Sequence, residues 1–95
     1  MNSKERAYLR KLAQKITPIF QIGKGGVTEN FIKMVDETLE VRELLKITLL
    51  SNSEEDIKEV TNEITEATNC EVVQIIGHKI TIFRPSVNKP VIKLP

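Results

Sequence analysis

The residues best suited to bind a ligand are positions 23–26, which read Gly-Lys-Gly-Gly and which we call the glycine loop. An apolar run over residues 19–22 precedes them and predicts a strand, while Thr28 is typical of a cap that opens a helix. Glycine allows a ligand to approach the backbone closely, and the first N–H groups of a helix carry partial positive charge. The loop is therefore suited to phosphate oxygens, and Lys24 adds a full positive charge.

This loop does not match the two glycine-rich motifs that bind nucleotides. A dinucleotide fingerprint, G-x-G-x-x-G counted from Gly23, would place its last glycine at Thr28. A Walker loop has its lysine after the final glycine, whereas Lys24 precedes Gly25 and Gly26. The remaining pattern is G-x-x-G, with which KH modules clamp the backbone of a single-stranded nucleic acid. An ordinary strand-to-helix turn is the alternative interpretation.

The sequence offers little for catalysis or for metal binding. Cys70 and His78 are its only soft ligands, and we expect a small buried thiol and a hairpin-turn residue, respectively. An enzyme acting on a phosphorylated small molecule would need a base, a nucleophile or a metal near the loop, where Glu29 and Asn30 are the only candidates. We therefore expect no enzymatic activity, no metal and no cofactor.

The 95 residues fit one domain, and the lone cysteine excludes an internal disulfide. Charges throughout residues 1–16 argue against a signal peptide, and no apolar run reaches the length of a membrane span. We expect a soluble cytoplasmic protein with a domain over residues 1–86 and an extended, loosely held basic tail over residues 87–95.

The formal charge of +1 is unevenly distributed along the chain. Residues 1–26 carry six bases against one acid, residues 27–71 carry four bases against twelve acids, and residues 72–95 carry four bases and no acid. Such segregation predicts one surface that attracts a polyanion and another that repels it. For the acidic middle, a solvated surface without a partner is the alternative.

The predicted elements follow the order helix, strand, helix, strand, helix, strand, strand. Helices are expected over residues 3–16, 29–39 and 54–68, and strands over 19–22, 44–50, 70–76 and 79–84. Ser3, Thr28 and Ser53 are the expected caps, the last paired with Asp56. The fold class is thus α/β: a four-stranded mixed sheet with a parallel pair joined by a right-handed crossover, an antiparallel hairpin, and helices on both sides of part of the sheet.

Two of these helices carry opposite charges on their exposed faces. The first buries Leu9, Leu12, Ala13 and Ile16, and it presents Lys4, Lys11 and Lys15 on the opposite side, with Tyr8 beside them and Arg6 and Arg10 at the other edge. The third turns Ile57, Val60, Ile64 and Ala67 inward and Glu55, Glu59, Glu63 and Glu66 outward. The first helix can therefore contact RNA, and the third cannot.

Five stretches of the sequence resemble the CRM domain in its stand-alone bacterial form, the YhbY family. They are residues 6–13 (RAYLRKLA), 18–26 (PIFQIGKGG), 42–46 (RELLK), 73–77 (VQIIG) and 83–85 (FRP). The resemblance covers about residues 3–86 and leaves out the tail. It implies an RNA-binding module similar in fold to the C-terminal domain of translation initiation factor three. It also implies association with precursors of the large ribosomal subunit, and no DNA partner.

On this resemblance and the charge pattern, the expected RNA-binding residues are Gly23, Lys24, Gly25, Gly26, Arg6, Arg10, Lys11, Lys15, Lys79 and Arg84. Arg42 and Lys46 match family positions that either bind RNA or brace the fold. The leading hypothesis is binding to large-subunit rRNA or pre-ribosomal particles during ribosome assembly. A second is a protein-interaction module that uses the acidic third helix against a basic ribosomal protein. The third is the enzyme considered above.

Overall fold

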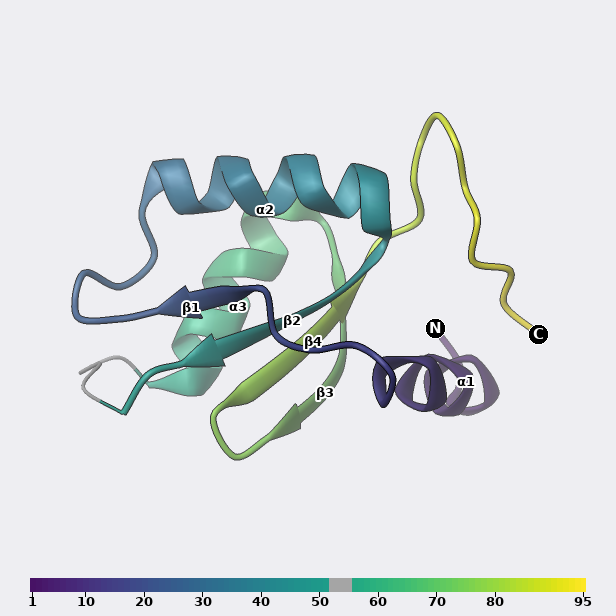
Figure 1. Cartoon of the computed structure of the whole chain (residues 1–95), viewed down its shortest axis with the longest axis horizontal. Coiled ribbons are helices and arrows are strands. Elements are labelled where there is room, and N and C mark those ends of the chain that lie inside the picture. Colours follow the sequence, from purple (N-terminus) through teal and green to yellow (C-terminus); the bar gives the residue numbers. More distant parts are fainter. Residues whose placement is uncertain (52–55) are drawn as a thin grey trace.

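The computed structural model describes residues 1–51 and 56–95, and within them three helices and four strands follow in the expected order (Figure 1). The elements are α1 (Ser3–Ala13), β1 (Phe20–Ile22), α2 (Glu29–Arg42), β2 (Leu44–Leu49), α3 (Ile57–Thr68), β3 (Glu71–Ile76) and β4 (Lys79–Phe83). The α/β fold class is confirmed. No helix in the described ranges is long and apolar enough to cross a membrane.

The four strands form one mixed sheet in the order β1-β2-β4-β3. β1 pairs with β2 in parallel, and β4 pairs antiparallel with both β2 and β3. The predicted parallel pair and hairpin are thus confirmed. Gly77 and His78 make the tight turn of that hairpin, with Gly77 at a φ of 57° that suits glycine.

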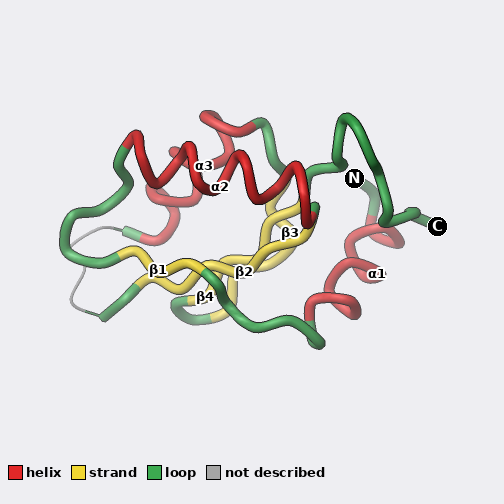
Figure 2. The backbone as a smooth tube through the Cα atoms, turned by 45° about the horizontal axis from the view of Figure 1, so that its top comes forward, coloured by secondary structure: helices red, strands yellow, loops and turns green. Residues whose placement is uncertain are grey.

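One face of the sheet is covered by α2 and α3 (Figure 2). Leu45, Ile47 and Leu49 alternate along β2 toward this face, as their spacing predicts, and each is at most 3% exposed. Val35 of α2 and Ile64 of α3 are fully buried against them. This larger core fixes β1, β2 and β4 in register and therefore fixes the start of the glycine loop.

The opposite face of the sheet is covered only in part, by α1. A second core joins Leu9 and Ala13 of α1 to Leu44, Val73 and Phe83 of the sheet. Helices thus lie on both sides of part of the sheet, as expected. Because α1 contacts β2 and β3 near one end, polar side chains further along these strands remain uncovered.

Two helix ends differ from the sequence expectations. Asn2, not Ser3, caps α1: its side chain accepts from the backbone N–H of Glu5 at 2.8 Å, and the Glu5 carboxylate accepts from the N–H of Asn2 at 2.9 Å. This reciprocal pair is a capping box, which requires the glutamate three residues after the cap. The helix also ends at Ala13 instead of Ile16, because the next residues form tighter turns: the N–H groups of Gln14, Lys15 and Ile16 donate to the carbonyls three residues before them.

The other two helices match the predictions more closely. Thr28 caps α2, as expected, and α2 continues to Arg42, where Glu43 ends it at a φ of 67°. Asp56 caps α3 by accepting from the N–H of Lys58 at 2.8 Å, whereas the expected cap Ser53 lies outside the described residues.

On α3, the expectation of an inward Ala67 is wrong. Ala67 is exposed, and Thr61 and Thr68 are buried instead. Their hydroxyl groups donate to the carbonyls of Ile57 and Ile64, so both threonines can be buried without an unpaired polar group. Glu59, Glu63 and Glu66 are exposed, as predicted, whereas Glu55 lies outside the described residues.

The C-terminal tail is held more firmly than the sequence predicts. Oε1 of the buried Glu43 accepts from the N–H groups of Val91 and Ile92 at 2.9 and 2.8 Å, and its Oε2 accepts from Ser86 N–H at 2.8 Å. Burial raises the pKa of Glu43, but these three N–H groups outweigh it and leave the pKa below its ordinary value. The expectation of a loosely held tail is therefore wrong.

The neighbouring Glu40 extends this arrangement. Its carboxylate accepts from the hydroxyl of Ser86 and from the N–H groups of Val87 and Asn88, which lowers its pKa. The tail then returns beside α1, where Ile92 and Leu94 pack on the smaller core (Figure 1). The segment after β4 thus serves as a strap between the end of α2 and α1.

Candidate nucleic-acid interface

The glycine loop projects from the end of the sheet as a hydrogen-bonded turn. The N–H of Gly26 donates to the carbonyl of Gly23 at 3.0 Å, and Gly26 has a φ of 66°, which a residue with a side chain rarely adopts. Lys24 and Gly25 occupy the tip of this turn, and both are exposed. The turn therefore presents its lysine and one bare stretch of backbone to a ligand.

The glycine at position 25 is not explained by the protein's own packing. A Cβ built on Gly25 would meet nothing within 4 Å, and Gly25 is not among the residues with positive φ. A Cβ on Gly23 would meet only the Leu50 side chain, at an ordinary 3.6 Å. A ligand backbone that approaches the tip closely would explain the glycine at position 25.

The helix that follows the loop, α2, adds one group that favours phosphate binding and one that opposes it. Thr28 accepts from the N–H of Phe31 at 3.1 Å, which fixes the first turn of α2 beside the loop. The positive end of the α2 dipole therefore lies at Thr28, three residues after Gly25 in the chain. The exposed Glu29 carboxylate in the same turn opposes a phosphate, so Lys24 must supply the attraction at this end.

The uncovered face of the sheet begins two residues before the loop. Gln21 of β1 pairs with Thr48 of β2, and Thr48 pairs with Lys79 of β4. Paired residues point to the same face of a sheet, and their neighbours Ile22, Leu49 and Ile80 lie in the larger core on the opposite side. This row therefore lies on the face that α1 partly covers, about 12 Å or less from Gly23 by strand geometry.

A second row lies beside the first. Lys46 of β2 pairs with Thr81 of β4, and Thr81 pairs with Gln74 of β3. A cavity of about 540 Å³ opens between these rows and the end of α1. Its lining comprises Arg10, Ala13, Gln14, Lys46, Gln74, Ile76, Lys79 and Thr81. Lys46, which the sequence left undecided, thus lies at the cavity with Arg10 and Lys79.

These cations are not neutralised by nearby acids in the described part of the chain. The ion pairs there join the N-terminus to Glu71 and Arg84 to Asp36. We call the surface formed by Lys24 and by Arg10, Lys46 and Lys79 the basic face. It combines the glycine loop with the open side of the sheet, and the acidic side chains of α3 lie on the opposite side.

A smaller cavity of about 410 Å³ lies where the ends of α1 and α2 meet the tail. Lys15, Arg42 and Lys46 contribute its charged lining, and Ile16, Ile19 and Ile92 contribute apolar lining. Lys46 reaches both cavities, so the positive surface continues around the end of α1. Lys11 and Lys15 are exposed on α1.

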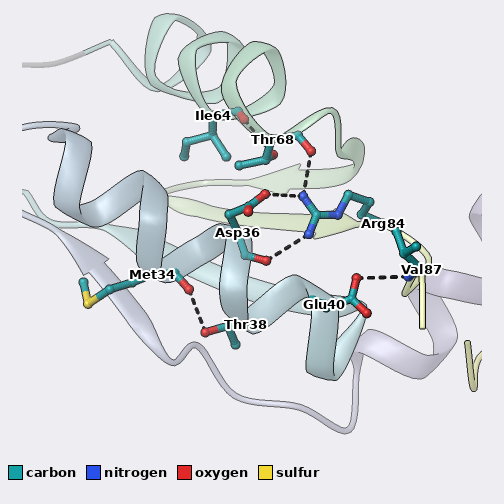
Figure 3. A network of polar contacts seen from close by, with 8 residues as sticks. All are labelled: Met34, Asp36, Thr38, Glu40, Ile64, Thr68, Arg84 and Val87. Atoms are coloured by element: carbon teal, nitrogen blue, oxygen red, sulfur yellow. Dashed lines mark hydrogen bonds and ion pairs between the residues drawn. The ribbon is translucent and has the colours of Figure 1, made fainter. Parts of the chain in front are cut away.

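Two arginines expected to bind RNA are engaged inside the protein. Arg84 forms an ion pair with Asp36 and donates to the carbonyls of Thr68 and Asp36 at 2.8 and 2.9 Å (Figure 3). It therefore joins the end of α3 to the middle of α2. Arg6 donates to the carbonyls of Val72 and Val73 and attaches α1 to β3.

The sequence expectations did not include Gln14, Gln74 and Thr81. Gln74 is separated from the loop by more than 45 positions, and a β-bulge between Val72 and Gln74 shifts the register of β3. The alternation of β2 could have assigned Lys46 to the open face, because its neighbours Leu45 and Ile47 are apolar. The signal for the two glutamines appears only in the folded sheet.

Comparisons with known proteins agree on one family. The model of the CRS1 / YhbY (CRM) domain matches residues 1–84. The chain is 41% identical over 95 residues to "Probable RNA-binding protein YqeI" of Bacillus subtilis, and the match covers 100% of this chain and 99% of the relative. It is 30% identical over 86 residues to an RNA-binding protein of Haemophilus influenzae, covering 90% and 87% of the two chains.

The chain also matches a more distant plant protein and a solved structure. CRS2-associated factor 1 of Arabidopsis thaliana chloroplasts is 26% identical over 84 residues, which cover 88% of this chain but 12% of the plant protein. The solution structure of a Staphylococcus aureus protein proposed to bind RNA superposes with a TM-score of 0.81 at 50% identity, covering 100% of this chain and 99% of the other.

Proposed function

The chain belongs to the CRS1 / YhbY (CRM) domain family, and from this membership and its basic face we propose that it binds structured RNA. Phosphates are held by the tip of the glycine loop and by the cations of the open sheet face. Recognition rests on backbone and shape more than on stacking, because the chain contains three phenylalanines and one tyrosine. The function is binding, and catalysis forms no part of the proposal.

The observation that carries the proposal is Gly25. Its exposed backbone has free space around it and needs no glycine for the fold, yet it lies beside Lys24 at the start of the basic face. A phosphate chain that contacts the loop can continue toward Lys79 and Lys46 on the same side of the sheet. The acidic α3 lies on the other side and orients the bound RNA.

The RNA partner we propose is large-subunit rRNA, in a pre-ribosomal particle in the cytoplasm, where the protein would assist assembly. This step rests on the resemblance to the YhbY family: the match to YqeI covers 100% of this chain and 99% of the relative. Crosslinking the protein to RNA in cells and sequencing the attached fragments tests it. Enrichment of large-subunit rRNA and its precursors is expected, whereas fragments dominated by mRNA or tRNA would contradict this partner.

The binding site itself is tested with Lys24→Glu. We expect affinity for rRNA fragments to fall steeply as salt rises, because Lys and Arg side chains release counterions when they contact phosphates. Lys24→Glu should weaken binding at least tenfold at low salt, since it replaces attraction at the loop tip with repulsion. Lys33→Glu on the exposed side of α2 is the matched control and should change affinity much less. Equal effects of the two variants would refute the proposed site.

A further inference from the structure

The cavity between α1 and the open sheet face has the size and the lining of a ligand site. Its volume of about 540 Å³ lies within the range of roughly 300–1,000 Å³ that is typical of small-molecule pockets. Its floor is formed by side chains of three strands, and its wall by the last turn of α1 and the following Gln14. Rigid elements therefore define it on both sides.

The pairing of the strands fixes the order of groups on the floor. Lys46, Thr81 and Gln74 form one row across β2, β4 and β3, and Lys79 and Ile76 form the next row. Neighbouring strands lie about 4.8 Å apart, so Lys46 and Gln74 are separated by about 10 Å. A ligand that spans this width can contact a cation at one end and a carboxamide at the other.

The chemistry of the lining selects for a nucleotide. Arg10, Lys46 and Lys79 provide three positive charges for phosphate. Gln14 and Gln74 each carry an amide donor and a carbonyl acceptor, which can pair with the edge of a base. Ala13, Ile76 and the aliphatic stems of the lysines offer apolar contact to a base face, and a guanidinium plane can stack on it.

We infer that this cavity holds one unpaired nucleotide of the bound RNA, with its base against Gln14 and Gln74 and its phosphate on Lys46 and Lys79. The base must be unpaired, because the bases of a duplex are stacked and their Watson–Crick edges are occupied. The inference rests on the proposed RNA-binding function and deepens it. The glycine loop contacts the RNA backbone without distinguishing bases, and the cavity adds a preference for one base.

The three glutamines of the chain provide a direct measurement. Gln14 and Gln74 line the cavity, whereas Gln21 lies on the same sheet face outside it. Titration of the full ¹⁵N-labelled chain with single-stranded RNA of ten nucleotides should shift the side-chain amide signals of Gln14 and Gln74 and leave those of Gln21 nearly unchanged. Signals of Gln21 that shift as much as the other two would overturn the inference.

Base preference is measured with a randomised ten-nucleotide RNA pool, followed by Kd values for the selected sequence and its single-base variants. We expect about a tenfold preference at one position, the size of a good contact to a base edge. The double variant Gln14→Ala and Gln74→Ala should reduce the preference to twofold or less and keep the salt dependence, while Gln21→Ala should retain both.

Each other outcome refutes a distinct statement. Salt-dependent RNA binding without base preference, or a preference that survives in the double variant, overturns the nucleotide site and leaves the RNA-binding function intact. Absence of salt-dependent RNA binding overturns both. If the four nucleoside 5′-monophosphates bind as tightly as the RNA, the cavity serves a free nucleotide instead, and the inference is wrong.

Discussion

The double substitution Lys46→Gln and Lys79→Gln tests whether the open sheet face carries RNA. Both lysines lie on strands of the sheet and line the cavity beside α1. Glutamine removes the charge and keeps much of the aliphatic stem, so the variant should remain folded. A matched control, Lys33→Gln with Lys58→Gln, removes the same net charge from exposed positions on α2 and α3.

The magnitude follows from the number of cations on the basic face and its extension around α1. Six such residues in the structure are Arg10, Lys15, Lys24, Arg42, Lys46 and Lys79. If each contacts one phosphate of a single strand, log K should fall with log salt at a slope of about −4.2, and a fourfold rise in salt should weaken binding about three-hundredfold. Removal of two contacts should change the slope by about 1.4 and reduce the loss to about fiftyfold.

The assay is fluorescence anisotropy with a labelled rRNA fragment at several salt concentrations between 50 and 200 mM. The slope of log Kd against log salt is compared among the wild type, the sheet-face variant and the control variant. The control should keep the wild-type slope. If the two variants lower the slope equally, net charge alone governs binding and our assignment of the sheet face is refuted.

Three further variants separate binding from stability. Gly25→Ala should change the free energy of unfolding by no more than about 0.5 kcal/mol and bind RNA several-fold more weakly. Gly26→Ala should lower the free energy of unfolding by about 1–2 kcal/mol because of the positive φ at this position. Urea unfolding measures the stability and anisotropy the RNA affinity, and wild-type affinity of Gly25→Ala would contradict a close approach of RNA to the loop tip. Arg84→Met should lower the free energy of unfolding by about 1.5–3 kcal/mol, because the contacts to Asp36 and Thr68 are removed. The RNA affinity should change no more than about threefold. A larger loss of affinity in folded protein would show that Arg84 contacts RNA. Glu43→Gln should lower stability at neutral pH by about 1.5–3 kcal/mol, since one N–H of the tail loses its acceptor. Because the pKa of Glu43 in the folded protein lies below its ordinary 4.5, the stability that this carboxylate contributes is complete above pH 4.5 and disappears as the pH falls through the folded pKa. The melting temperature of the variant should therefore depend less on pH in that window than that of the wild type. An unchanged pH dependence would show that the carboxylate does not hold the tail.

Local chemistry was sufficient to predict the elements and the loop from the sequence. Thr28 predicts the start of α2 because its hydroxyl can accept a backbone N–H within three residues. Gly77 and His78 predict a hairpin for a similar reason, since two residues set the turn. The G-x-x-G pattern and the excess of bases before residue 27 are also readable directly from the chain.

Which cations are paired inside the protein and which are open to a ligand could be determined only from the tertiary structure. Arg84 and Lys79 are five residues apart on one strand and its extension, yet Arg84 meets the Asp36 carboxylate of α2, while Lys79 lies on the open face. A sequence pattern records charge but not the partner that neutralises it. The tail shows the same limit, because the acceptor that holds its N–H groups is Glu43, more than forty positions earlier.

What the sequence by itself determined was therefore the order of the elements, the glycine loop between β1 and α2, and the segregation of charge, since each depends on residues close together in the chain. Only the tertiary structure decided that Lys46, Lys79, Arg10 and Gln74 share one cavity. Strand pairing and the β3 bulge bring these four residues from separate elements to one face, and no local pattern encodes such a distance in space.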